Sequence, residues 1–131
     1  MKGFNHPALV RSARVLLSCA AVVIAVMAFT PLMAKLPIAN LSDKFYHITA
    51  FTVLTILAVV SFPRSRPWVL AVALLSFGLM IEVIQSVPAL RRSAEGLDVV
   101  ADAIGISAGF TVCLLLHLAL LRRSKLLVAG Y

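Results

Sequence analysis

The sequence contains four long apolar segments, at residues 15–33, 45–62, 68–90 and 99–121. Each is close to the ~20 residues that an α-helix needs to cross the hydrocarbon core of a membrane. Because that core holds no water to hydrogen bond a bare backbone, such segments form helices, and these are too long and too uniformly apolar for barrel strands. We therefore predict an all-α polytopic membrane protein, with residues 1–131 forming a single domain built as a four-helix transmembrane bundle.

The basic residues give the chain a formal net charge of +7, from 12 Lys and Arg against 5 Asp and Glu. They are scattered over short connecting segments without interleaved aromatic residues, so we expect no nucleic-acid partner. By the positive-inside rule, the connecting segments richer in Lys and Arg lie in the cytoplasm. Those are the N-terminal segment, the second loop and the C-terminal segment (Lys2, Arg11, Arg14, Arg64, Arg66, Arg122, Arg123 and Lys125), against the first and third loops (Lys35, Lys44, Arg91 and Arg92). Both termini are thus predicted to be cytoplasmic.

The first apolar segment also resembles a signal peptide, with a basic start, an apolar middle and a cleavage point after Ala34. Its apolar run is longer than the about 7 to 15 residues of a signal-peptide core, and three further spans follow it. We therefore favour an uncleaved first helix.

The five carboxylates of the chain all lie inside the apolar segments or within a few residues of their ends. On insertion scales a charged side chain at the centre of a membrane helix costs roughly 2.5 to 3.5 kcal/mol, so such residues usually face a partner or a wet cavity. The carboxylates therefore locate a candidate site. They are Asp43, Glu82, Glu95, Asp98 and Asp102.

Three separate stretches of sequence bring polar side chains to one depth on the outer side of the membrane. Each belongs to a different predicted helix, and two residues separated by three or four positions share one face of a helix. We expect these groups to converge in the bundle. They are Asp43 with His47 in the second helix, Glu82 with Gln85 in the third, and Asp98 with Asp102 in the fourth.

Small residues continue the acidic stripe of the fourth helix. Asp98, Asp102, Gly105 and Gly109 follow one face, and glycines on such a face let two helix backbones approach closely. Gly78, one turn inward of Glu82, is a second candidate for close helix packing.

The motifs in these three stretches resemble the VanZ-like family of small bacterial membrane proteins. They are Asp43-Lys44-Phe45-Tyr46-His47 with Phe51, then Glu82-Val83-Ile84-Gln85, then Pro88, Arg91 and Ser93, then Asp98 with Gly105 and Gly109. The resemblance covers residues 43–109, and it implies a bacterial inner membrane and a link to resistance against a glycopeptide antibiotic, teicoplanin. It implies no established reaction. The family pattern usually has Asn in the place of Asp102, so we expect Asp102→Asn to be tolerated and Asp98 to keep its charge.

Within this site, His47, Glu82 and Asp98 are the candidate catalytic residues. We assign substrate binding to Asp43, Lys44, Gln85, Arg91 and Asp102. A metal site is chemically conceivable, but the sequence has no compact HxxxH or HExxH spacing, so we expect no metal and no other cofactor.

The outward site and the family resemblance together favour recognition or modification of a cell-envelope component, such as a lipid-linked or peptidoglycan-related headgroup. Whether the protein is an enzyme stays open. One alternative is a non-catalytic assembly or accessory subunit whose acids only hold helices together, and another is a small proton-coupled transporter. The expected partners are membrane lipids and an anionic envelope precursor, with a second copy of the chain as an open alternative.

Overall fold

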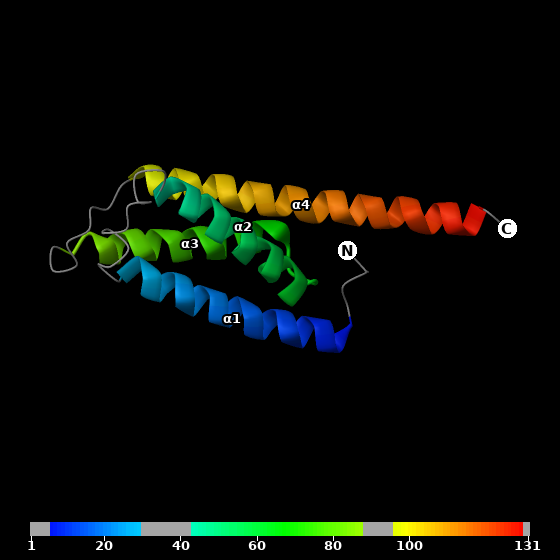
Figure 1. Ribbon diagram of the computed structural model, residues 1–131, viewed down its shortest axis with the longest axis horizontal. Helices are drawn as coiled ribbons and strands as arrows, with labels where there is room; N and C mark the ends of the chain where they lie inside the picture. The colour runs from blue at the N-terminus through cyan, green and yellow to red at the C-terminus, as the bar shows by residue number, and fades with distance from the viewer. Residues whose placement is uncertain (1–5, 30–42, 88–95, 130–131) are drawn as a thin grey trace.

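The computed structural model describes residues 6–29, 43–87 and 96–129, and it contains four helices (Figure 1). They are α1 (Pro7–Phe29), α2 (Asp43–Ser61), α3 (Pro67–Gln85) and α4 (Gly96–Ala129). The described residues include no strand, and all four helices are long and apolar enough to cross a membrane. The predicted all-α four-helix architecture is confirmed.

Two helices extend further into polar sequence than predicted. Helix α1 begins at Pro7 and not at residue 15, and α4 continues to Ala129 and not to residue 121. Proline suits the first position of a helix, where its missing N–H costs nothing, and Leu, Arg and Lys are good helix formers. Hydropathy therefore marks the membrane-crossing part of these helices and not their ends.

Helix α3 ends earlier than predicted, at Gln85 and not at residue 90. The backbone N–H of Ser86 donates to Glu82 O and that of Val87 to Ile84 O, which closes the last turn. Pro88 follows in the sequence, and the residue before a proline is disfavoured in the α conformation. Residues 88–90, like residues 30–33 of the first predicted segment, lie outside the described residues.

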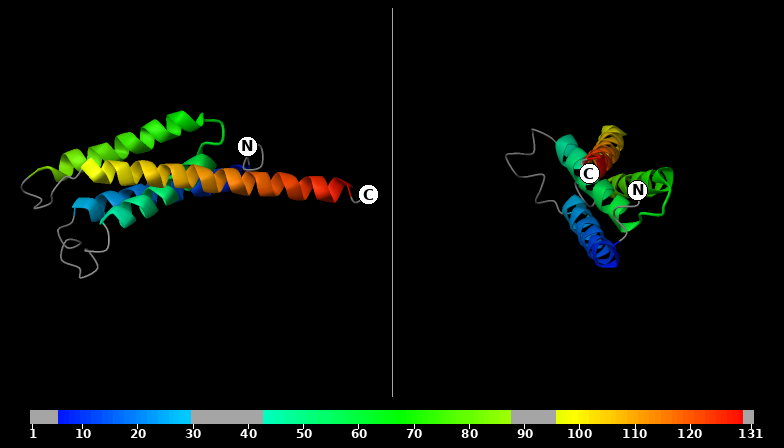
Figure 2. Two further views of the ribbon diagram at one scale, coloured as in Figure 1. Left: turned by 90° about the horizontal axis from the view of Figure 1, so that it is seen from above. Right: turned by 90° about the vertical axis from the view of Figure 1, so that its right-hand side faces the viewer.

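The helices alternate in direction, and α2 lies between α1 and α4 (Figure 2). Helix α3 contacts all three of the others. The apolar core of the bundle is built from α2, α3 and α4, and its buried members are Phe51, Leu54, Ala58, Leu74 and Ile106. The C-terminal part of α4 projects well beyond the other helices (Figure 1).

The most extensive contact between helices joins α2 to α4, and two glycines permit it. A Cβ atom on Gly105 would lie 2.5 Å from Ile48 O, and one on Gly109 would lie 2.6 Å from Thr55 Cβ. Because a backbone carbonyl of a helix has no rotamer to change, only glycine fits opposite Ile48. The pair is stabilised by the hydroxyl of Thr52, which donates to Ile48 O at 2.7 Å and to Gly105 O at 3.1 Å.

We predict that Gly105→Ala lowers the thermal unfolding midpoint of the purified protein in detergent, by the equivalent of about 1–3 kcal/mol for an overpacked contact. Gly96→Ala is the matched control, because a Cβ atom there meets nothing within 4 Å. Equal midpoints for Gly105→Ala and Gly96→Ala would contradict the close approach of α2 and α4.

Candidate functional site

The start of α2, the end of α3 and the start of α4 meet at one end of the bundle, on the left in Figure 1. Among the described residues, four polar side chains are buried there, although all come from apolar helices. They are Glu82 (5% exposed), Gln85 (3%), Asp98 (2%) and Asp102 (0%). We call this group, together with Lys44 and His47 of α2, the polar cluster.

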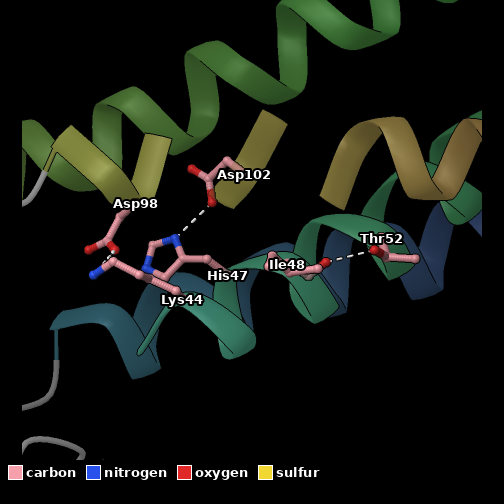
Figure 3. Close-up of polar contacts among 6 residues, drawn as sticks. All are labelled: Lys44, His47, Ile48, Thr52, Asp98 and Asp102. Atoms are coloured by element: carbon pink, nitrogen blue, oxygen red, sulfur yellow. Dashed lines mark hydrogen bonds and ion pairs between the residues drawn. The ribbon is translucent and has the colours of Figure 1, made fainter. Parts of the chain in front are cut away.

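A histidine and an aspartate form a close side-chain contact in the polar cluster. His47 Nδ1 lies 2.7 Å from Asp102 Oδ1, and the two side chains reach toward each other from α2 and α4 (Figure 3). The His47 ring also stacks on Phe51, with ring planes 5° apart and centroids 6.5 Å apart. These two contacts hold the imidazole in one orientation, and its other nitrogen, Nε2, is turned toward the side of Lys44 and Asp98 (Figure 3).

A lysine and a second aspartate form the outermost pair. Lys44 Nζ lies 3.7 Å from Asp98 Oδ1 (Figure 3). The Lys44 side chain is 44% exposed, whereas that of Asp98 is 3% exposed. The pair therefore joins a buried carboxylate to the rim of the bundle, where an ion pair is screened and contributes little stability by itself.

Three side chains from three helices come together in the polar cluster. One ligand atom each of His47, Glu82 and Asp98 lies within 4.8 Å of the other two. The sequence predicted a common depth for these groups, but it did not predict which of them would meet. An imidazole beside two buried carboxylates can bind a cation or move a proton, and it can donate a hydrogen bond to a bound molecule.

Asp102 is placed differently from the other two acids. Its Oδ1 atom contacts His47, while its Oδ2 atom faces Gly78 of α3 and has no hydrogen-bond donor among the described residues. A Cβ atom on Gly78 would collide with this carboxylate. The Asp102 carboxylate occupies the space that a side chain at position 78 would fill. A residue larger than glycine there would displace Asp102 from His47.

The remaining predicted site residues differ in what the structure says of them. Gln85 donates from Nε2 to Ala28 O at 2.9 Å, so its amide joins α3 to α1. The backbone of Asp43 begins α2, but its side chain lies outside the described part of the chain. Arg91 lies outside the described residues altogether.

Sequence reasoning missed two polar contacts that support the bundle. The Thr52 hydroxyl joins α2 to Gly105, and Arg14 Nε donates to Ser61 O at 3.1 Å with its guanidinium 5.3 Å from the Phe62 ring centre. The Thr52 contact had a signal in the sequence, since a hydroxyl in an apolar helix seeks a backbone carbonyl. The Arg14 contact had none, because the residue was counted as a charge outside the first helix.

A hollow of about 280 Å³ lies away from the polar cluster, beside the turn between α2 and α3. Its lining is largely apolar and includes Phe62, Leu70, Phe110, Cys113 and His117. It contains none of the predicted site residues, so we attach no chemistry to it.

We predict that Asp102→Asn keeps the unfolding midpoint in detergent near that of the unchanged protein, because an amide can pair with His47 Nδ1 in either tautomer. Asp102→Ala removes the partner of a largely buried imidazole nitrogen, and should cost about 1–3 kcal/mol. The control is Ser107→Ala, whose exposed hydroxyl bonds only within its own helix, to Ala103 O. A loss in Asp102→Asn as large as in Asp102→Ala would show that the charge is needed and not the acceptor.

The chain was compared with protein families, curated proteins and solved structures. No family model matches the chain, and neither a curated protein nor a solved structure does.

Proposed function

We propose that this chain is a VanZ-like protein of the bacterial inner membrane, and that its polar cluster recognises or modifies a component of the cell envelope. The observation that carries the proposal is the convergence of His47, Glu82 and Asp98 from three helices at one end of an apolar bundle. Buried ionisable groups in a membrane are costly, and they commonly mark binding sites or pathways.

The predicted orientation of the chain in the membrane connects the polar cluster with the cell envelope. With both termini in the cytoplasm, the end of the bundle that carries the polar cluster faces outward, where lipid-linked and peptidoglycan-related headgroups are found. The exposed Lys44 at the rim would meet the anionic part of such a headgroup first. The resemblance of residues 43–109 to the VanZ-like family points to the same class of ligand.

The accessory-subunit alternative is favoured by the polar contacts that join helices, since His47–Asp102 and Lys44–Asp98 join α2 to α4. Gln85 is engaged with the α1 backbone, which shows that at least one polar side chain of the polar cluster joins two helices. In that alternative the acids stabilise the bundle and bind nothing. The transporter alternative gains no specific contact, since the described residues of the polar cluster gather at one end of the bundle.

Orientation can be tested with single cysteines in a background carrying Cys19→Ala and Cys113→Ala. We expect Ser42→Cys and Ser93→Cys to react with an impermeant thiol reagent in intact cells, because the predicted first and third loops face outward. Ser65→Cys and Ser124→Cys should react only after the cells are opened, and both residues are exposed in the structure. The reverse labelling pattern would overturn the envelope proposal.

Ligand recognition can be tested by lipid mass spectrometry of the protein purified in mild detergent. We expect an anionic envelope lipid to copurify with the unchanged protein and to be lost in Glu82→Gln and in His47→Ala, with membrane levels near normal. His117→Ala is the matched histidine control, because His117 lies outside the polar cluster. Loss of the protein itself in both site variants would favour the accessory-subunit alternative.

A further inference from the structure

The polar cluster places buried carboxyl groups beside a histidine. Glu82, Asp98 and Asp102 are buried there, and His47 of α2 lies among them. Carboxylates taken out of water need protons, cationic partners or a metal ion. An anionic headgroup would also be repelled by these acids unless a positive charge stood between them.

We infer that His47, Glu82 and Asp98 form a binding site for one divalent cation of the Zn²⁺ or Mn²⁺ type. Their ligand atoms lie within 4.8 Å of one another. Ligands about 2.1 Å from a zinc ion are roughly 3.4 Å apart across a tetrahedral angle, so the side chains need to draw inward by about 1 Å on binding. Side-chain rotation alone covers that distance.

Asp102 is placed where a metal-binding histidine usually has a partner. Metal-binding histidines usually donate their other ring N–H to a carboxylate or carbonyl, which sets the tautomer and makes the binding nitrogen more basic. Asp102 Oδ1 lies 2.7 Å from His47 Nδ1, on a side chain that is fully buried. With a proton on Nδ1, the nitrogen that binds a cation is Nε2, which is turned toward the side of Asp98 (Figure 3).

The ligand set favours some cations over others. Imidazole suits zinc and other transition metals, while carboxylates also suit Mn²⁺ and Mg²⁺. One imidazole with two carboxylates therefore favours Zn²⁺ and Mn²⁺ over Ca²⁺, which takes six to eight oxygen ligands. The exposed Lys44 competes with the cation for Asp98, so its ammonium must turn away toward the rim when the cation binds.

Three protein ligands leave at least one coordination position open, as in catalytic zinc sites. A phosphate oxygen of a headgroup could occupy that position, and the cation would then offset the repulsion between the headgroup and the buried acids. This role of the cation in headgroup recognition rests on the proposed function. The binding of the cation to His47, Glu82 and Asp98 does not depend on that function.

The test uses the full chain, purified in detergent with a tag that contains no histidine and stripped of metal with a chelator. Zn²⁺ and Mn²⁺ are then titrated in competition with a chromophoric chelator. We expect one Zn²⁺ per chain, with affinity reduced at least about 100-fold in His47→Ala, Glu82→Gln and Asp98→Asn. Asp102→Asn, which keeps an acceptor for His47, should weaken binding by about tenfold, at the mild end of such effects. His117→Ala should bind as the unchanged protein does.

A second measurement needs no variant. Zn²⁺ should raise the unfolding midpoint of the unchanged protein, and Co²⁺ in its place should give the visible absorption of a site with nitrogen and oxygen ligands. Failure of the unchanged protein to bind any of these ions would overturn the inference, as would binding that survives in the three ligand variants or is lost in His117→Ala. If the protein binds Zn²⁺ but no envelope lipid copurifies with it, the metal site is supported and the proposed function is contradicted.

Discussion

The close approach of α2 to α4 is the contact on which the rest of the structure depends. Gly105 and Gly109 present no side chain to α2, so the backbone of α4 lies directly against Ile48 and Thr55. At this separation the short side chain of Asp102 reaches the His47 ring. If the helices lay further apart, the Asp102 carboxyl and the His47 imidazole would lose their contact. Inside an apolar bundle, a polar group that loses its partner destabilises the fold. Packing and site geometry are therefore set by the same two glycines.

The polar groups at the end of the bundle act as a set and not as separate residues. Asp102 holds His47, Lys44 contacts Asp98, and Gly78 leaves room for Asp102 beside α3. In a medium of low dielectric constant, a buried polar group that loses its hydrogen-bond partner keeps a desolvation penalty that nothing offsets. The helices that carry these groups must accordingly fold together, because none of them can bury its own charge.

Sequence reasoning predicted the number, order and helical state of the membrane segments, because the bilayer allows a long apolar segment few other structures. It also predicted that His47, Glu82 and Asp98 would share one depth, since each has a defined distance from the end of its helix. It could not predict that His47 would pair with Asp102. That choice depends on how each helix is rotated and on the register between α2 and α4, which interhelical contacts such as Thr52 to Gly105 decide. The continuation of α1 and α4 into charged sequence was missed for another reason, since hydropathy detects lipid contact and not helix formation.

Helix α4 runs without interruption from Gly96 to Ala129 and carries charge near both ends of its apolar stretch. Asp98, held by Lys44, is separated from Arg122 by about 36 Å of helix at 1.5 Å per residue. The hydrocarbon core of a bilayer measures about 30 Å. Because the helix between them is longer than the core is thick, both charged ends can reach the headgroup layers together at tilts up to roughly 30°, and a larger tilt would pull one of them into the lipid tails. The tilt of α4 is therefore coupled to the thickness of the membrane, and a thicker or thinner bilayer would change the distance between the polar cluster and the headgroups.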